Sequence, residues 1–369
     1  MAIQRLEITG VRNILSAKLD LNPRVNVFYG QNGSGKSSVL EAAFLIGLGR
    51  SFRSNKIKSI INNESEKCTV FANISPNEKA GLIVPVGVIK NRDGTQVIKI
   101  SNRPANSASA LAENLPLQII NSDTYQLLDG SPKQRRQFID WGVFHVEHTF
   151  LKEWKQFFTS LKQRNALLRN EKIDSQQMKI WTNSLTTSSE SIDTLRREYI
   201  ANLHPIFEEL LSRMNKQLEG ITLQYYRGWE ENCSLAEVLK NGLIVDRKQG
   251  FTRFGPHRAD LIIKIGNQLA SEVLSRGQQK LLVYALRLAQ GRLLARECSK
   301  VCCYLLDDLP SELDEEHQQI LCELFEEIGS QVIITCVDRK ALFEKWKDLN
   351  TVSMFHVEHG RITKESLPD

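Results

Sequence analysis

The sequence lacks the features that mark secreted or membrane-spanning chains. Its seven cysteines are an odd number with no Cys-x-x-Cys pair, and several lie in apolar runs such as residues 302–303. They are expected to be reduced core thiols. Glu7 stands where a signal peptide needs apolar side chains, and no apolar run approaches the length needed to cross a bilayer. We therefore expect a cytoplasmic protein without contact to a membrane.

A strong excess of one charge is also missing. The 48 basic and 43 acidic residues are interspersed and give a formal charge of only +5. This balance permits contact with a polyanion but does not by itself indicate one. The hydrophobic content of 41% and the charged content of 25% are ordinary for a globular protein. A length of 369 residues suggests about two domains.

The chain has no internal repeat unit, although one pentapeptide occurs twice. The sequence FHVEH stands at residues 144–148 and 355–359, but the flanking residues do not match. A His-x-x-His pair can bind a metal ion on a helix. The second copy is expected in a strand, where residues three apart point to opposite faces. We interpret the two copies as a coincidence and not as a metal site.

What the sequence does contain is a P-loop. Residues 30–37 (GQNGSGKS) satisfy the pattern G-x-x-x-x-G-K-[ST], between a predicted strand at 25–29 and a predicted helix at 38–48. The glycines let backbone N–H groups turn toward phosphates, and the helix N-terminus favours negative charge. Lys36 can reach the β- and γ-phosphates of ATP, and the Ser37 hydroxyl can ligate Mg²⁺. The expected nucleotide-binding residues are Gly30, Gln31, Asn32, Gly33, Ser34, Gly35, Lys36 and Ser37.

Hydrophobic periodicity predicts a β-rich beginning. Alternation at residues 3–8 and 67–74 predicts strands. Residues 82–89 and 97–100 predict two more, joined by the turn sequence at 91–94.

The middle of the chain is expected to be helical. Apolar spacing predicts helices at 150–161 and 192–218, the second interrupted near Pro205. Several further elements are expected along the chain: loops at 169–177 and 186–191, strand-like alternation at 242–265, a helix at 278–297, buried strands at 301–306 and 331–335, and a closing hairpin at 352–356 and 361–362.

Two further motifs follow the P-loop in the order of an ABC-type ATPase. Residues 274–280 (LSRGQQK) fit the signature L-S-x-G-Q at the start of a helix. Residues 301–308 (VCCYLLDD) form an apolar strand that ends in Asp307 and Asp308, and SELD follows at 311–314. Asp307, at the end of a parallel strand, can hold Mg²⁺. Asp308 can orient or deprotonate the attacking water, so the catalytic candidates are Asp308 and Lys36.

This order of motifs resembles ABC-type ATPase heads, and within them the SMC-like branch and its RecF-like recombination mediators. Landmarks at residues 6–13, 49–53, 130–140 and 254–260 carry the closer resemblance. The resemblance implies an α/β fold, with mixed β-sheets around a P-loop helix and an inserted α-helical lobe or short arm. Lobe I would comprise residues 1–120 and 295–369, with the P-loop and the Asp307 strand. Lobe II, mostly helical, would comprise residues 121–294 and carry the signature at its end.

The resemblance also implies a function and partners. Proteins of this kind are weak ATPases that dimerise on ATP and bind single-stranded or gapped DNA and its junctions with duplex. They act with RecO and RecR in loading RecA, and they support SOS induction. The signature would meet the ATP of a second copy, so that ATP joins a two-fold dimer. Further nucleotide contacts are then expected from Ser275, Gly277, Gln278, Asp314 and Arg12.

The chain departs from the ABC pattern at two positions. Most heads have Glu at the position of Asp308 and His at the position of Cys336. A shorter carboxylate and a poor donor both predict slow ATP turnover. The position of the usual active-site glutamine falls at Asn121 or Ser122, with Gln126 nearby.

The surface that would contact DNA is the least defined. Two clusters are candidates, each of which could equally be a solvated face. The roles of His257 and Arg258 stay open. The clusters are Arg50, Arg53, Lys56 and Lys58, and Lys133, Arg135 and Arg136.

Two other functions are compatible with the nucleotide motifs. An ABC transporter subunit would have the same three motifs, but it leaves the segments at 130–140 and 255–260 unexplained. It also calls for Glu and His at positions 308 and 336. A non-catalytic scaffold would keep ATP only for structure.

Overall fold

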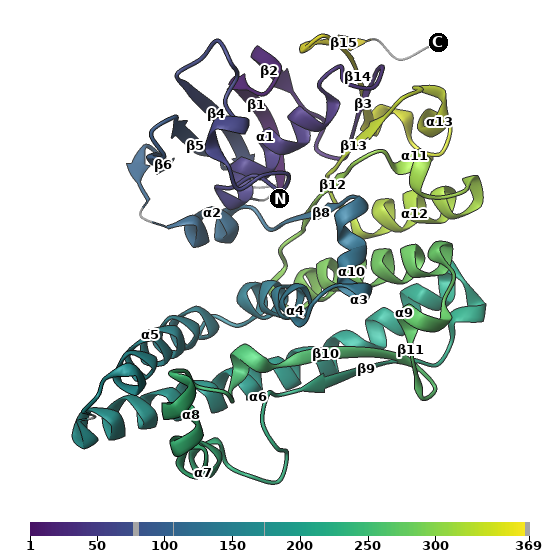
Figure 1. Cartoon of the computed structure of the whole chain (residues 1–369). Coiled ribbons are helices and arrows are strands. Elements are labelled where there is room, and N and C mark those ends of the chain that lie inside the picture. The colour runs from purple at the N-terminus through teal and green to yellow at the C-terminus, as the bar shows by residue number, and fades with distance from the viewer. Residues whose placement is uncertain (77–80, 106, 173, 366–369) are drawn as a thin grey trace. The chain divides into compact units, whose positions relative to one another are not determined.

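The computed structural model describes residues 1–76, 81–105, 107–172 and 174–365. The chain forms two compact units (Figure 1). The first combines Met1–Thr124 with Leu294–Asp369, and the second is Tyr125–Leu293. Each is described by itself.

The first unit contains an antiparallel sheet built almost wholly from the beginning of the chain. Its strand order is β2-β1-β4-β5-β6-β7. The strands predicted at 3–8, 67–74, 82–89 and 97–100 are confirmed. The bounds are β1 (Ala2–Val11), β2 (Ile14–Asp20), β4 (Lys67–Ser75), β5 (Val84–Asn91), β6 (Gln96–Ile100) and β7 (Arg103–Pro104).

The second sheet of this unit holds the P-loop strand in its interior. Its order is β15-β14-β3-β13-β12-β8, parallel except for β15. Strand β3, which leads into the P-loop, therefore lies between β13 and β14 from the other end of the chain. The bounds are β3 (Val25–Tyr29), β8 (Leu117–Ile120), β12 (Cys303–Leu306), β13 (Val332–Cys336), β14 (Val352–Glu358) and β15 (Arg361–Glu365).

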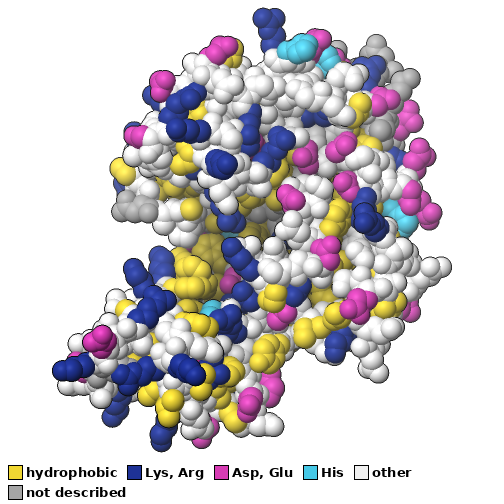
Figure 2. Space-filling model, viewed as in Figure 1, with side chains coloured by type: hydrophobic (Ala, Val, Ile, Leu, Met, Phe, Trp, Pro, Cys, Tyr) yellow, Lys and Arg dark blue, Asp and Glu magenta, His cyan; other side chains and the backbone are white. Residues whose placement is uncertain are grey.

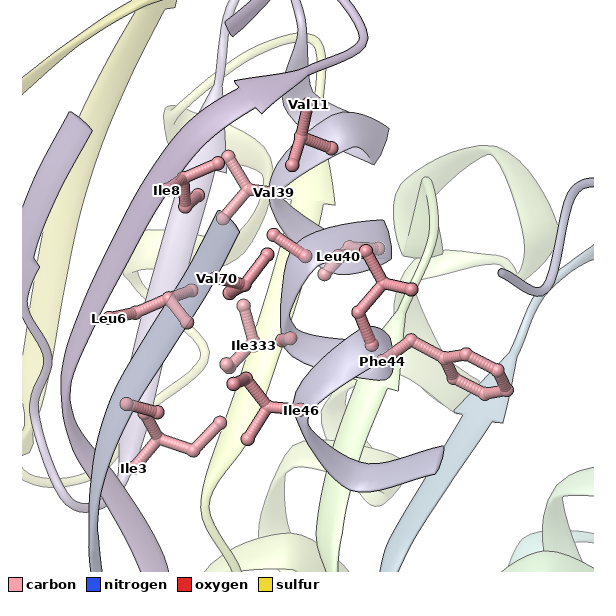
Figure 3. Packing of buried hydrophobic residues seen from close by; sticks show 14 of the residues in the cluster. Ile3, Leu6, Ile8, Val11, Val39, Leu40, Phe44, Ile46, Val70 and Ile333 are labelled. Carbon is pink, nitrogen blue, oxygen red and sulfur yellow. The ribbon is translucent and has the colours of Figure 1, made fainter. Parts of the chain in front are cut away.

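The P-loop helix α1 (Lys36–Leu48) is buried on nearly all sides, because it packs against strands of both sheets. Figure 3 shows Leu40, Phe44 and Ile46 of α1 among side chains of β1, β4 and β13. Each fully buried aliphatic side chain contributes roughly 1.5–3 kcal/mol. This core fixes the start of α1, and with it the P-loop. The other helices of the unit are α2 (Ala108–Asn114), α11 (Leu309–Glu312), α12 (Glu315–Ile328) and α13 (Lys340–Phe343).

The second unit combines helices with a small antiparallel sheet of order β11-β10-β9. Helices α5 and α6 pack along each other and form a hairpin. The bounds are α3 (Gln126–Asp129), α4 (Pro132–Val146), α5 (Phe150–Arg169), α6 (Ser175–Met214), α7 (Leu235–Asn241), α8 (Leu243–Gln249), α9 (Ala270–Val273), α10 (Arg276–Cys298), β9 (Ile221–Tyr226), β10 (Asp260–Ile265) and β11 (Gln268–Leu269).

Helix α6 overturns two predictions. The loop predicted at residues 186–191 is helical, and the helix continues through Pro205. The hydroxyls of this polar run are accommodated within the helix, where they donate to carbonyls one turn back. Thr186 donates to Thr182 O at 2.9 Å, and Ser191 donates to Thr187 O at 3.1 Å.

The strand-like alternation predicted at 242–265 is also wrong for its first part. Residues 243–249 form helix α8, which ends at Gly250 in the left-handed conformation (φ 72°). Only the end of the range forms a strand, β10. Asp246 of α8 is buried and binds Arg164 of α5 at 2.9 Å, a contact between distant residues that local alternation does not reveal.

The two FHVEH copies adopt different structures. The first lies at the end of α4 and the second at the end of β14, as predicted for the second copy. Along the ranges that the structure describes, no group of three or more His, Cys, Asp or Glu side chains is arranged to hold a metal ion. In the same ranges, no helix combines the length and apolarity needed to cross a membrane.

Candidate nucleotide-binding site

The P-loop curves between β3 and α1, as predicted. Gly30 adopts φ 150° and Gly35 adopts φ 120°, values that favour glycine. A Cβ atom at Gly30 would lie 2.2 Å from the carbonyl oxygen of Val357 in β14. A Cβ atom at Gly35 would lie 2.9 Å from the Asn13 side chain. A larger residue at either position would therefore clash with Val357 or Asn13, and it would also disfavour the observed φ angle.

The Lys36 side chain is held inside the curve of this loop. Its ammonium group donates to the carbonyl oxygens of Gly30 at 2.7 Å and Gln31 at 3.0 Å. The residue is largely buried but lines the cavity described below. The positive charge is thus placed where a P-loop binds phosphate.

Ser37 and Asp307, each predicted as an Mg²⁺ ligand, lie in direct contact. Ser37 Oγ donates to Asp307 Oδ1 at 2.9 Å. Thr335 Oγ1, at the end of β13, donates to the same oxygen at 2.8 Å. The backbone N–H of Asp308 donates to Thr335 Oγ1 at 2.8 Å. A hydroxyl and a carboxylate this close are oxygen ligands of the kind that Mg²⁺ prefers. Sequence reasoning missed Thr335, whose role depends on strand order.

Asp308 lines the same cavity in a left-handed backbone conformation, with φ 57°. Its Oδ2 accepts a hydrogen bond from Ser311 Oγ at 2.8 Å. Glu312, four residues later, also lines the cavity. The cavity therefore presents, besides Asp307 and Asp308, a carboxylate that sequence reasoning did not single out as a site residue.

Arg12 forms a bidentate ion pair with a buried carboxylate. Its Nε and Nη2 donate to the two oxygens of Glu41 at 2.8 and 2.9 Å. Glu41 is fully buried in α1, whereas 23% of the Arg12 side chain is exposed. Ser51 Oγ also donates to Glu41 and accepts the N–H groups of Arg53 and Ser54 at 3.0 Å. Glu41 thereby joins Arg12 to the loop after α1.

Asn13 braces the P-loop from the turn after β1. Its Nδ2 donates to Ser34 O at 3.0 Å, and its Oδ1 accepts the Ser38 hydroxyl at 2.9 Å. The contact joins the turn between β1 and β2 to both sides of Lys36. Sequence reasoning gave Asn13 only as a landmark.

These groups surround one cavity of about 900 Å³ within the first unit. This volume suits a small-molecule or cofactor ligand. Arg53 and Lys58, which were candidates for DNA contact, line it as well. Ser122 lines it too, which favours Ser122 over Asn121 at the glutamine position. The other lining residues include Arg12, Asn13, Asn32, Gly33, Gly35, Lys36, Ser37, Asp307, Asp308, Glu312 and Thr335.

Cys336 is a buried residue of β13, next to the cavity-lining Thr335. It is fully buried in β13, and burial raises the pKa of its thiol to about 12. The described residues that line the cavity include Thr335 but not Cys336. Of these two neighbouring residues of β13, Thr335 is therefore the one that lines the cavity.

Comparison with known proteins decides the family. The family model described as RecF/RecN/SMC N terminal domain matches residues 2–363. The DNA replication and repair protein RecF of Pseudomonas aeruginosa (strain LESB58) is 48% identical over 364 residues, 99% of this chain and 98% of the relative. The protein of the same name from Azotobacter vinelandii is 49% identical and covers 99% of each chain. The chain belongs to the RecF family.

Solved structures agree with the RecF-family fold. The structure described as the recombination mediator protein RecF-ATP in the RecFOR pathway has a TM-score of 0.85 at 24% identity, over 99% of this chain and 98% of that one. An Smc head bound to the C-winged helix domain of ScpA has a TM-score of 0.59 at 17% identity, over 100% and 98%. These likenesses concern the fold alone. The predicted fold class, an ABC-type ATPase head of the SMC branch, is confirmed.

The signature of this RecF-family chain lies in the second unit, at the start of α10. Ser275 and Gln278 form a reciprocal cap there. Ser275 N–H donates to Gln278 Oε1 at 3.0 Å, and Gln278 N–H donates to Ser275 Oγ at 3.3 Å. A Cβ atom on Gly277 would meet nothing within 4 Å. The first turn of α10 is thus exposed and open at Gly277.

Asp314 caps helix α12. Its Oδ1 accepts the backbone N–H of His317 at 3.0 Å, which lowers the pKa of the carboxyl group. This contact gives Asp314 a structural role within its own chain. Its predicted role at a dimer interface stays a prediction.

Two arginines that were candidates for DNA contact are held inside the second unit. Arg135 forms a bidentate ion pair with Asp260. Its Nε donates to Oδ1 at 2.7 Å and its Nη2 donates to Oδ2 at 2.9 Å. Arg136 donates to Ala259 O at 2.8 Å. Both side chains fix the segment before β10, and the charge of Arg135 is paired with Asp260. These two members of the second cluster therefore have structural contacts, whereas Lys133 is exposed and its role in DNA contact stays a prediction.

The same segment places His257 inside the unit. Its Nε2 donates to Thr252 O at 3.1 Å, and its ring lies 5.8 Å from that of Phe157. Burial lowers the pKa of His257 to about 4, so the ring is neutral at physiological pH. Arg258 is exposed and lies 5.7 Å from the Phe251 ring. Neither residue lines the cavity of the first unit within the described ranges.

Proposed function

We propose that this protein is an ATP-dependent DNA-binding protein of DNA replication and recombinational gap repair. One observation carries the proposal. The ammonium of Lys36, the hydroxyl of Ser37 and the carboxylate of Asp307 converge in one cavity behind a P-loop. The relatives named DNA replication and repair protein RecF support the cellular role.

ATP and Mg²⁺ fit the groups that line this cavity. The P-loop N–H groups and Lys36 suit a triphosphate, and Ser37 with Asp307 suits Mg²⁺. Bound Mg²⁺ would offset charge on the β- and γ-phosphates. Thr335 holds the Asp307 oxygen in place, and Arg12, positioned by Glu41, adds a cation at the cavity wall.

Hydrolysis is proposed to be slow and to act as a switch. Asp308 is the catalytic candidate that orients water, but its Oδ2 is also bound to Ser311. The short side chain and this internal contact both restrict its reach. These features support a weak ATPase, and its dependence on DNA is proposed from the family.

ATP is proposed to join two copies. The exposed first turn of α10, with Ser275, Gly277 and Gln278, would meet the nucleotide of a second copy through backbone N–H groups. Asp314 would lie near the same seam. The resulting dimer has two equivalent sites.

The partners are proposed from the family. A solved relative is described as a recombination mediator in the RecFOR pathway. By that likeness the chain would act with RecO and RecR at gapped or single-stranded DNA, help to load RecA and support SOS induction. It would work in the cytoplasm, at the nucleoid.

One binding experiment tests the proposal. The protein is titrated onto gapped, single-stranded and blunt duplex DNA, each with and without ATP and Mg²⁺. Tighter binding with ATP is expected, and a Lys36→Arg variant should lose that gain. If the affinity for every DNA were the same with and without ATP, the proposal that ATP controls DNA binding would be wrong. A Lys36→Arg variant that still gains affinity would separate DNA binding from this cavity.

A further inference from the structure

The free end of the α5–α6 hairpin carries a patch of exposed cations. It is built by the last turn of α5, the first turns of α6, and helix α8, and Figure 2 shows Lys and Arg side chains gathered there. We name this patch the hairpin end. Its exposed basic residues are Arg169, Lys172, Lys179, Arg247 and Lys248.

These cations differ from four other arginines of the unit that pair with carboxylates. Arg169 donates to Gly250 O and Arg247 to Glu171 O, so both bind backbone carbonyls. Among the residues that the structure describes, none of the five lies within salt-bridge distance of a carboxylate. By contrast, Arg135, Arg164, Arg196 and Arg197 each pair with Asp or Glu. The positive charge of the hairpin end is therefore not neutralised within the unit.

The acidic side chains nearby offset only part of this charge. Asp174 accepts the N–H groups of Gln176 and Gln177 at 2.9 and 3.0 Å, so it serves as the N-cap of α6. Asp246 is fully buried and bound by two arginines. Glu171 and Asp174 are the exposed carboxylates of the turn between α5 and α6, against five exposed cations in the patch.

The platform beneath the patch is fixed by a buried ion network. Arg164 of α5 and Asp246 of α8 are 1% and 0% exposed, and their charged atoms lie 2.9 Å apart. Arg253 binds the other Asp246 oxygen at 3.0 Å. Arg164 also donates to Thr252 Oγ1 at 2.6 Å. Because breaking such a buried pair is costly, α8 is held firmly against the hairpin.

We propose that the hairpin end is a contact surface for the phosphodiester backbone of a nucleic acid. The hairpin end is predominantly positive and is held rigidly by the buried ion network, so it suits a ligand with evenly spaced negative charges. Duplex DNA presents one negative charge per about 1.7 Å of its axis. The inference rests on the proposed function and adds to it a second binding region, outside the first unit.

The test reverses two exposed lysines of the patch. In the full-length protein, the double variant Lys172→Glu with Lys179→Glu is compared with wild type. The control is the double variant Lys99→Glu with Lys216→Glu, which changes net charge equally. Lys99 lies on β6, and Lys216 follows the far end of α6, a helix of 40 residues or about 60 Å. Unfolding curves and nucleotide-driven dimerisation of all variants are recorded alongside.

The readout is the salt dependence of the affinity for duplex and single-stranded oligonucleotides. Losing two phosphate contacts should flatten the slope of log K against log salt by about 1.8 for duplex and about 1.4 for single strands. Between about 200 and 50 mM salt, wild type should therefore gain roughly 12-fold more duplex affinity than the hairpin variant. The control should keep the wild-type slope.

Two results would overturn the inference. One is a hairpin variant with the wild-type slope and affinity, which would assign the patch to a partner such as an acidic protein. The other is an equal loss in the control variant, which would reduce the effect to net charge. Failure of the proposed function has a different signature, namely wild-type binding that ATP does not strengthen.

Discussion

Glu41 offers the sharpest test of how the nucleotide cavity is held together. This carboxylate is fully buried in α1 and accepts two N–H groups from Arg12 and the hydroxyl of Ser51. A Glu41→Gln substitution keeps the shape of the side chain. It removes the charge and turns one acceptor oxygen into a donor, which then faces an Arg12 donor.

The expected loss can be worked out from this geometry. Breaking a buried ion pair costs about 3–5 kcal/mol. Arg12 keeps 23% exposure, so water can recover part of that loss. We expect the free energy of unfolding to fall by about 2–3 kcal/mol. Ser51→Ala, which removes one hydrogen bond and keeps the bidentate ion pair, should cost only about 1 kcal/mol.

Urea unfolding of the purified variants measures these losses, and a double-mutant cycle with Arg12→Met isolates the pair. A coupling energy of about 1.5–3 kcal/mol is expected for residues in direct contact. Nucleotide affinity, measured by titration with an ATP analogue, should weaken in Glu41→Gln. Amide hydrogen exchange should rise in residues 50–54, because Ser51 accepts two N–H groups of that loop.

A near-zero coupling energy would refute the reasoning, because it would mean that Arg12 and Glu41 contribute independently. Wild-type nucleotide affinity in Glu41→Gln would instead show that Arg12 needs no positioning. The two outcomes separate a structural pair from one that serves the cavity.

Further predictions concern turnover, assembly and pH. Asp308→Asn should slow ATP hydrolysis at least tenfold in a phosphate-release assay, whereas Glu312→Gln should keep most activity; the reverse order would move the catalytic role to Glu312. Ser275→Arg should abolish ATP-driven dimerisation in light scattering while the monomer still binds nucleotide through Lys36, and a mutant that still dimerises contradicts the shared site. Since the pKa of His257 is lowered to about 4 from an ordinary 6.5, the stability it contributes is present above pH 6.5 and is lost as the pH falls toward 4. Wild type should lose about 2 kcal/mol more than His257→Gln between pH 7 and pH 5 in urea unfolding, and equal losses would count against a buried neutral ring.

The parts of the fold that depend on short, local sequence patterns could be predicted. The P-loop, its strand and its helix follow from one octapeptide and its apolar flanks. The strands of the first sheet follow from alternation. Asp307 could be placed near Ser37 because parallel strands bring their carboxyl ends to one edge.

Long-range pairing could not be predicted in the same way. From the sequence alone, Arg135 is interpreted as an unpaired cation, because its partner Asp260 lies 125 residues later in the chain. Thr335 becomes a site residue only because β13 lies between β3 and β12. The loop predicted at residues 186–191 was wrong for a different reason. Serine and threonine hydroxyls can either compete with helix formation or donate to a carbonyl one turn back within a helix, and the sequence does not show which.

The position of β3 between β13 and β14 has a consequence for biosynthesis. The strand that leads into the P-loop is made early, but both of its neighbours in the sheet come after residue 331. At about 5–20 residues per second, the ribosome needs roughly 15–60 s to cover that interval. The ATP pocket therefore cannot close on a half-made chain, and a nascent molecule stays unable to sense nucleotide until its last strands emerge.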